Sequence, residues 1–326
     1  MRIAVDGMGG DRAPEQVVLG AAQAAQDFGV DLTVVGQPGH VQTLVDSHTG
    51  LTFVPASQVI GMDEHPAQAV RSKPDSSLAV CARLCKDGAV DAWVSAGNSG
   101  AIMAAALFLQ GRIRGVDRPT LGTILPARDR PCYFLDVGAN VDSRPDFLVQ
   151  FARMGAVFAE QVLDRRPPRV GLLANGEEES KGDELVREVH RRLREEAVGF
   201  EFHGNVEPKE VVAGRVDVVV TDGFVGNVTI KMGEATADLI MGTLREEIPR
   251  TLRGKIGGLL IRPSVDRIRR QLDWREFGGA PLLGIDGVAV VAHGRSDARA
   301  LRSAVGVAKQ AVDAGLVQKI REAVGT

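Results

Sequence analysis

The chain has 326 residues, of which 44% are hydrophobic and 25% charged, and this composition excludes disordered, collagen-like and coiled-coil proteins. The length allows two ordinary domains or one large α/β domain. The net charge of −3 argues against nucleic acid as a partner, because no global basic field surrounds such a chain.

Apolar runs that predict strands alternate with 3.6-residue patterns that predict helices along almost the whole chain. The run 216–220 is entirely apolar, which is typical of a strand buried on both faces of a parallel sheet. In chain order, the expected strands are 2–6, 32–35, 51–55, 92–95, 120–125, 133–137, 170–173, 216–220, 281–285 and 288–292, and the expected helices are 13–28, 75–86, 98–110, 144–164, 180–196, 225–247 and 296–316. The last two strands are predicted to form a hairpin around Asp286 and Gly287. We therefore expect one three-layer α/β domain over residues 1–326, with a mostly parallel sheet.

The three cysteines lack zinc-binding spacing and no other metal-ligand pattern is present, so we expect no metal. Such cysteine usage is typical of a reducing cytoplasm. The sequence shows neither a signal-peptide pattern nor an apolar run of the ~18 residues that span a membrane. These features predict a cytoplasmic protein.

Residues from about 248 to 280 depart from the α/β pattern. The run 250–275 holds eight basic residues and two acidic ones. Inside it lies a short apolar group, Ile256, Leu259, Leu260 and Ile261, flanked by Arg253, Lys255, Arg262, Arg267, Arg269 and Arg270. One interpretation is a basic helix pair packed on the body or on a second subunit. The other is a peripheral contact with an anionic membrane or an acidic partner.

Four strands end in turns rich in Gly, Asn, Asp and Ser, each of which opens a helix. If the carboxyl ends of the strands share one edge of a parallel sheet, these turns meet there, and free helix amides favour an anion such as phosphate. The candidate binding residues in these turns are Asp6, Gly7, Gly9, Gly10, Gly97, Asn98, Ser99, Gly100, Asp136, Asn140 and Asp222. Gly-rich turns between strands and helices are also common in proteins where they bind nothing, so each turn alone is weak support for an anion site.

A fifth segment combines Arg71 and Lys73 with Ser76 and Ser77 at an expected helix start. Two cations beside two hydroxyl groups make a plausible phosphate clamp, and the alternative is a helix cap with solvated charges. Dinucleotide binding is poorly supported, because Arg12 stands where the Rossmann pattern needs its third glycine. No P-loop sequence is present either, so we expect no nucleotide cofactor.

Together, segments 4–14, 69–77, 95–101, 135–140, 176–182, 204–207, 217–227 and 284–287 resemble the bacterial acyl-ACP:phosphate acyltransferases of phospholipid synthesis. The resemblance implies a fold like that of isocitrate and isopropylmalate dehydrogenases, shared with phosphate acetyltransferase. It implies a homodimer without cofactor or metal that converts acyl carrier protein thioesters and inorganic phosphate into acyl phosphate. The resemblance also places Lys181 in the active site.

Asn227 is the second catalytic candidate, because its carboxamide follows the strand 216–220 and can donate a hydrogen bond to an oxyanion. A surface lysine and a helix-capping asparagine are the structural alternatives for these two residues. Three other functions remain open from the sequence: a CoA-dependent phosphate acetyltransferase, a decarboxylating dehydrogenase, and a non-enzymatic membrane scaffold that uses the basic segment alone.

Overall fold

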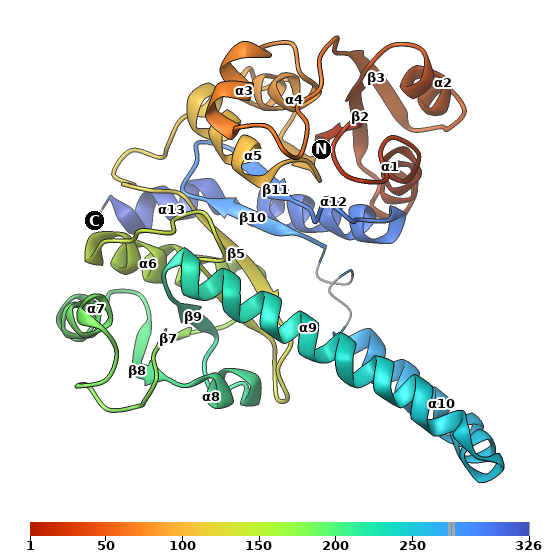
Figure 1. Ribbon diagram of the computed structural model, residues 1–326. Helices are drawn as coiled ribbons and strands as arrows, with labels where there is room; N and C mark the ends of the chain where they lie inside the picture. Colours follow the sequence, from red (N-terminus) through yellow and green to blue (C-terminus); the bar gives the residue numbers. More distant parts are fainter. Residues whose placement is uncertain (273–274, 276–277, 326) are drawn as a thin grey trace.

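A computed structural model describes residues 1–272, 275 and 278–325 (Figure 1). One eleven-stranded sheet runs through the molecule in the order β3-β2-β1-β4-β11-β10-β5-β6-β9-β7-β8. Most neighbouring strands are parallel, so the predicted α/β class with a mostly parallel sheet is confirmed. The expectation of a single domain over residues 1–326 stays a prediction.

The strands are β1 (Arg2–Asp6), β2 (Asp31–Gly36), β3 (Leu51–Pro55), β4 (Ala92–Ser95), β5 (Thr120–Leu125), β6 (Cys132–Leu135), β7 (Arg169–Leu173), β8 (Glu201–Val206), β9 (Val218–Val220), β10 (Ala280–Leu283) and β11 (Val288–Val291). The helices are α1 (Glu15–Phe28), α2 (His40–Asp46), α3 (Pro66–Ser72), α4 (Ser77–Lys86), α5 (Ser99–Ala105), α6 (Pro145–Val162), α7 (Glu184–Glu196), α8 (Pro208–Ala213), α9 (Gly223–Glu247), α10 (Leu252–Leu272), α12 (Ala298–Asp313) and α13 (Leu316–Val324). A π-helical turn, Ala106–Gln110, continues α5, and a 3-10 turn, Ile248–Arg250, joins α9 to α10.

The direction of the strands reverses in the middle of the sheet. The predicted hairpin pairs β10 antiparallel to β11, and β5 is antiparallel to both β10 and β6. Three antiparallel pairings in succession leave the strands β6, β9, β7 and β8 pointing opposite to β1, β2, β3, β4 and β11. The prediction that all carboxyl ends share one edge is therefore wrong, because it treated the whole sheet as parallel.

The sheet is buried on both faces, and the side chains alternate between two apolar layers. In β4, Ala92 and Val94 pack with α1 and α12 on one face, whereas Trp93 packs with α4 and α5 on the other. In β9, Val218 and Val220 face one layer and Val219 faces the other. This alternation confirms that the apolar strand 216–220 is covered on both sides, although its ladder begins at Val218.

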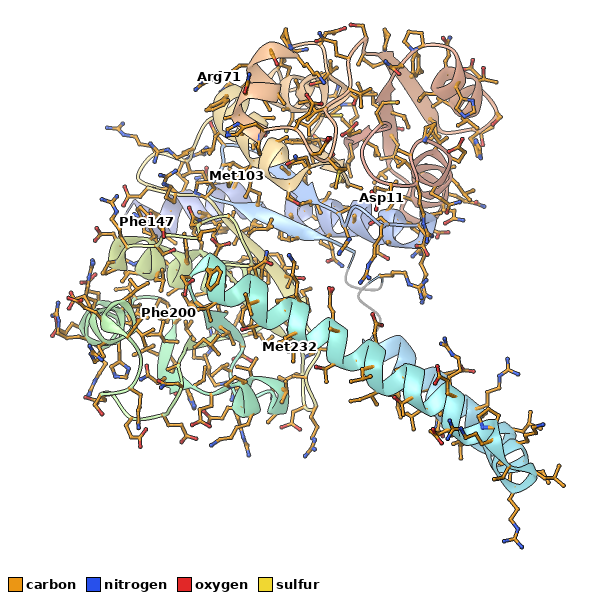
Figure 2. All side chains as sticks on the ribbon, in the orientation of Figure 1. Asp11, Arg71, Met103, Phe147, Phe200 and Met232 are labelled. Atoms are coloured by element: carbon orange, nitrogen blue, oxygen red, sulfur yellow. The ribbon has the colours of Figure 1, made fainter. Side chains whose placement is uncertain are left out.

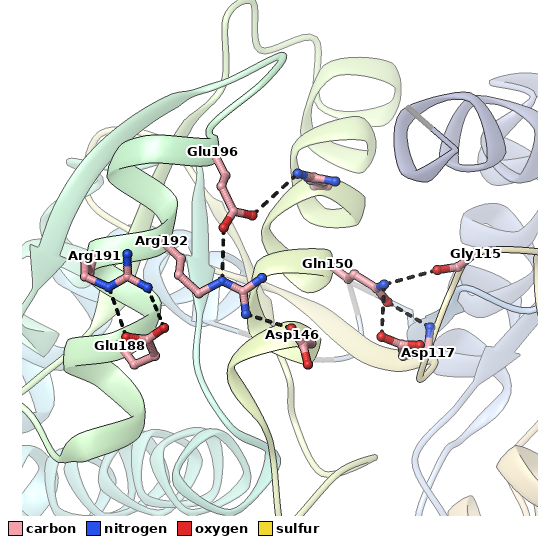
Figure 3. A network of polar contacts seen from close by, with 9 residues as sticks. Gly115, Asp117, Asp146, Gln150, Glu188, Arg191, Arg192 and Glu196 are labelled. Carbon is pink, nitrogen blue, oxygen red and sulfur yellow. Dashed lines mark hydrogen bonds and ion pairs between the residues drawn. The ribbon is translucent and has the colours of Figure 1, made fainter.

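We call the part of the molecule built on β1, β2, β3, β4 and β11 the upper half, and the part built on β6, β7, β8 and β9 the lower half (Figure 1). In the lower half, polar contacts link α6 to α7 (Figure 3). The guanidinium of Arg192 donates to Asp146 Oδ1 at 2.7 Å and to Glu196 Oε1 at 3.1 Å. The carboxylate of Glu196 also lies 4.0 Å from the guanidinium of Arg153. One arginine thus joins the first turn of α6 to the last turn of α7.

The helices α9 and α10 pack against each other and project from the body (Figure 1). The region of about 248–280 is therefore helical as far as residue 272, and its residues 273–274 and 276–277 lie outside the described part of the chain. The apolar group Ile256, Leu259, Leu260 and Ile261 lies on α10 near the projecting end, and all four side chains are exposed. The side chains of residues 269–272, including two of the flanking arginines, are not described.

Candidate active site

A cleft of about 430 Å³ lies between the two halves of the sheet. Each of the four Gly-rich turns contributes one lining residue, respectively Asp11, Ser99, Val137 and Asn227. Thr123 of β5, Ala280 of β10, Val291 of β11 and the following Ala292 form a further part of its lining. Although the two halves of the sheet run in opposite directions, turns from both of them line this one cleft. Figure 2 shows Asp11 and Met103 on the side of the upper half that faces α9.

The first two turns are locked together beneath the surface. The carboxylate of Asp6 is buried and accepts hydrogen bonds from Ser95 Oγ at 2.7 Å and from the amide of Met8 at 3.1 Å. Burial raises the pKa of Asp6, and these donors oppose that rise. A Cβ on Gly9 would lie 2.7 Å from Asp6 Oδ2 and 2.8 Å from the amide nitrogen of Gly97. Asp6 and Gly9 therefore shape the wall of the cleft from inside.

Asp136 organises the third turn. Its Oδ1 accepts the amides of Leu121, Gly138 and Ala139, at 3.0–3.2 Å. Its Oδ2 accepts the amide and the side-chain nitrogen of Asn140 at 2.7 and 2.8 Å. Burial raises the pKa of this carboxyl, and the hydrogen bonds from Ala139 and Asn140 partly offset that effect. Both oxygens thus accept hydrogen bonds from four backbone amides and one side chain, so Asp136 positions other groups.

Three further predicted residues also hold the backbone. Asn98 caps α5 by accepting the Ala101 amide at 3.1 Å, and its side-chain nitrogen donates to two carbonyls of the 62–64 loop. Asp222 caps α9 by accepting the amides of Phe224 and Val225, both at 2.9 Å. Asn140 donates to the Pro119 carbonyl at 2.8 Å in addition to Asp136.

Asn227 and Ser99 face the cleft from opposite halves. Asn227 lies in the first turn of α9, is half-buried, and donates through Nδ2 to the Val137 carbonyl at 2.9 Å. Gly138 has a φ of +131°, and a Cβ there would lie 2.5 Å from Asn227 Nδ2. Ser99 is exposed at the start of α5. The structure thus brings one of the two predicted catalytic residues to the cleft.

The other glycines of these turns serve as spacers. Gly7 has no room for a side chain between Val34 and the Val35 carbonyl, and Gly10 has a φ of +104° beside the Gly294 carbonyl. A Cβ on Gly100 would lie 2.6 Å from the ring of Pro66. Close backbone packing explains these positions without a bound anion.

Lys181 lies in the loop between β7 and α7 and is exposed, and it does not line the cleft. It was expected at a helix start, but α7 begins after Asp183, whose carboxylate caps the helix by accepting the Val186 amide at 2.8 Å. The side-chain oxygen of Asn175 accepts the Gly182 amide at 2.9 Å and so fixes the same loop. Within the described residues, the Lys181 ammonium has no hydrogen-bond or ion-pair partner.

The structure does not bring Arg71, Lys73, Ser76 and Ser77 together as an open clamp. Arg71 lies over the ring of Phe108 on the far side of the upper half (Figure 2), with its guanidinium carbon 4.9 Å from the ring centre. Lys73 pairs with Glu64, with 2.6 Å between Nζ and Oε1. Ser76 and Ser77 are buried, where Ser76 caps α4 and Ser77 bonds the Asp6 carboxylate.

Four charged or titratable residues of the cleft did not emerge from the sequence: Lys231, Glu234, His293 and Arg295. Arg295 pairs with Glu234, with 3.5 Å between the nitrogen and the oxygen. Burial, followed by the Arg295 charge, lowers the pKa of His293. Lys231 has no polar partner in the part of the chain that the structure describes. The spacing of residues 227, 231 and 234 on one predicted helix was a signal that could have revealed two of them.

Within residues 1–272, 275 and 278–325, no helix is both long and apolar enough to cross a bilayer. The same residues contain no group of three or more His, Cys, Asp or Glu side chains placed to hold a metal ion.

The fold is that of the phosphotransacetylases. A phosphotransacetylase from Staphylococcus aureus superimposes with a TM-score of 0.61, covering 96% of this chain and 94% of its own at 16% identity. A 4-hydroxythreonine-4-phosphate dehydrogenase from Klebsiella pneumoniae has a TM-score of 0.56, covering 96% and 97% of the two chains at 13% identity. These likenesses confirm the expected fold, which transferases and dehydrogenases share.

Sequence relatives identify the family. The model of a family described as fatty acid synthesis protein matches residues 1–319. A phosphate acyltransferase of Nostoc punctiforme is 45% identical over 98% of this chain and 96% of its own. One from Heliobacterium modesticaldum is 44% identical over 99% and 97%. The chain belongs to this family of phosphate acyltransferases, so it is an acyltransferase of fatty acid and phospholipid synthesis, as the resemblance implied.

Replacing Asp136 is expected to destabilise the site. Asp136→Asn turns one acceptor oxygen into an NH₂ group that faces the two donors of Asn140, which leaves buried N–H groups unpaired. We expect a loss of about 3 kcal/mol in the free energy of unfolding, measured by urea titration. The matched control is Asp129→Asn, an exposed carboxylate, with an expected change within about 0.5 kcal/mol. Equal free energies of unfolding for the two variants would contradict the organising role of Asp136.

Proposed function

We propose that the chain transfers a fatty acyl group from an acyl carrier protein thioester to inorganic phosphate, and that the reaction takes place in the cleft. The observation that carries this proposal is the convergence of four strand-to-helix turns on one cleft that also holds Lys231, His293 and Arg295. Cations and polar donors from both halves suit an anionic acceptor that must meet a second substrate.

The chemistry requires positioning more than a protein nucleophile. A phosphate oxygen attacks the thioester carbonyl carbon, a C–O bond forms, and a tetrahedral oxyanion develops. The C–S bond then breaks, and the thiolate leaves with the bonding electron pair and takes up the proton that phosphate releases. A thioester is already activated, so no ATP is consumed. The protein contributes by aligning the two groups and by stabilising the oxyanion.

Asn227 is proposed as an oxyanion donor, because its carboxamide lines the cleft without changing protonation. Lys181 is proposed to bind phosphate or the oxyanion as a point charge. One support for Lys181 is that its ammonium has no partner among the described residues. The other is that β7 and β9 are parallel neighbours, so the loop with Lys181 and the turn before α9 leave the same edge of the sheet. Movement of that loop toward the cleft is needed for contact.

Loss of either catalytic candidate is expected to lower turnover. Lys181→Ala should reduce acyl phosphate formation by about 100-fold while the fold persists. Asn227→Asp should lose more activity than Asn227→Ala, because a carboxylate repels the oxyanion. Both Asn227 variants lose the bond to Val137, so thermal midpoints are measured alongside rates. Near-normal rates in folded Lys181→Ala would remove its role, and the reverse ranking at residue 227 would indicate a structural one.

The position of phosphate is the next question. The sequence proposal places it at Arg71, Lys73, Ser76 and Ser77, whereas the cleft offers Lys231. We expect Lys231→Ala to raise the KM for phosphate by about tenfold with little change in the KM for the acyl donor. Arg71→Ala serves as the comparison, since Arg71 lies on the far side of the upper half. If only Arg71→Ala raises the KM for phosphate, phosphate binds at the segment 71–77 and not at Lys231.

The acyl donor has an alternative, which is coenzyme A. Both donors carry the same thioester, so they differ in what surrounds it: an acidic protein or an adenine nucleotide. Rates with acyl carrier protein and coenzyme A thioesters of one chain length separate them. A preference for the coenzyme A thioester would contradict the carrier-protein proposal and leave the phosphate acyltransferase activity intact.

We also propose that the projecting helices contact an anionic membrane and that the chain forms a homodimer. The exposed fractions of Leu259 and Leu260 are 69% and 78%, and cationic Arg253, Lys255 and Arg262 lie nearby on α10. Such a segment can lie at a membrane interface, where each basic residue contributes roughly 1 kcal/mol near anionic lipid. The competing interpretation is that these leucines pack against a second copy and the arginines bind acidic carrier protein.

Charge placed on the projecting end separates these interpretations. Replacing Leu259 and Leu260 by Glu should abolish flotation with anionic liposomes, while dimer mass and activity with soluble substrates persist. The matched control is Leu239→Glu, an equally exposed leucine (68%) on α9. The control should bind liposomes as the unmodified chain does. A monomeric double variant, or one that still binds liposomes, would contradict the membrane proposal.

A further inference from the structure

A second, smaller cavity of about 40 Å³ opens beside the cleft. Its larger side chains are apolar: Met103 of α5, Leu121 of β5, Leu282 of β10 and Val291 of β11, and the rest of the wall is formed by Ser99, Gly100, Gly138 and Ala139. We call this cavity the slot. It lies between α5 and the turn that Asp136 organises.

The slot adjoins the cleft. Ser99 and Val291 line both cavities, so only the side chains near the start of α5 and the end of β11 lie between them. Its other side begins at Gly138, where a Cβ would lie 2.5 Å from Asn227 Nδ2. The entrance of the slot is therefore next to the residue proposed to stabilise the oxyanion. Polar groups lie in the cleft, and apolar side chains lie in the slot.

Two of the walls cannot change without moving the backbone. Gly100 is held against Pro66, and Gly138 is held against Asn227 with a φ of +131°. Met103 is the adjustable wall, because it is half-buried and its unbranched side chain has three rotatable bonds. Figure 2 shows Met103 on the side of α5 that faces the lower half. Rotation of this one side chain changes the width of the slot.

We propose that the slot receives the hydrocarbon chain of the acyl donor and that Met103 determines how well long chains fit. This inference rests on the proposed acyl transfer in the cleft. A chain in the slot leaves the thioester carbonyl at the entrance, beside Asn227 and Ser99. Apolar walls favour methylene groups, and each methylene group removed from water strengthens binding about fourfold. The cavity is smaller than a fatty acyl chain, so Met103 moves when the chain enters.

The test compares donors of different chain length on variants of Met103. We expect Met103→Trp to lower kcat/KM for a palmitoyl thioester at least about tenfold more than for a butyryl thioester, because the larger ring blocks the slot. Met103→Ala widens the slot and should change the palmitoyl-to-butyryl ratio in the opposite direction. If Met103→Trp fails to fold, as judged by its thermal midpoint, Met103→Ala still decides the question.

The matched control is Met62, which lines the cleft but not the slot. Met62→Trp and Met62→Ala should leave the palmitoyl-to-butyryl ratio within about twofold of that of the unmodified chain. An unchanged palmitoyl-to-butyryl ratio in folded Met103 variants, or an equal change in the Met62 variants, would contradict the proposal that the slot receives the acyl chain. Failure of the unmodified chain to form acyl phosphate from any donor would overturn the proposed acyl transfer instead, so the two failures are distinguishable.

Discussion

Reversal of the sheet is the constraint on which the site depends. The antiparallel strands β10 and β5 separate two parallel halves that run in opposite directions. In a wholly parallel sheet, the turns would gather along one edge. Here the turns from the two halves meet over the middle of the sheet, and neither half holds a complete site. Such an arrangement suits a reaction between two substrates, since each half can hold one of them.

Close contact of the backbones makes that meeting possible. A Cβ on Gly226 would overlap the carbonyl oxygen of Asp136, and one on Gly223 would lie 2.6 Å from the Asn140 carbonyl oxygen. The start of α9 therefore packs directly on the third turn, and the Asp136 hydrogen bonds hold that turn in place. As a result, Asn227 and the residues one and two turns beyond it project from α9 toward the cleft.

Local sequence signals predicted the elements well. The apolar strands, the hairpin around residues 286–287 and the start of α4 after Ser76 are confirmed, because each depends on residues adjacent in the chain. The helix expected over 296–316 is α12, which ends at Asp313, and α13 was missed; it begins after Gly315, which adopts a left-handed conformation. The edge strand β8 was missed, because its exposed side chains lack a continuous apolar run.

The site was harder to predict, because the hydrogen-bond and ion-pair partners of its side chains depend on the fold and cannot be read from the sequence. Lys73 was expected to bind phosphate beside Arg71, yet its Nζ lies 2.6 Å from Glu64 Oε1 and forms an ion pair with it. Asp6, Asp136 and Asp222 looked like ligands, yet their oxygens accept backbone amides. Asp, Asn and Ser at turns satisfy local N–H groups first, so such residues indicate where a site forms more often than what binds there.

The charges of the cleft explain how an anion can enter without a permanent cationic pocket. Arg295 and Glu234 lie 3.5 Å apart and are partly exposed, so their attraction is weak in a solvated cleft. His293 adds no charge at neutral pH, because burial lowers its pKa. Lys231 then supplies a positive charge without a carboxylate partner among the described residues. In the proposed reaction, an incoming phosphate would pair with Lys231 and compete with Glu234 for Arg295, so the cationic groups would become available as the substrate binds.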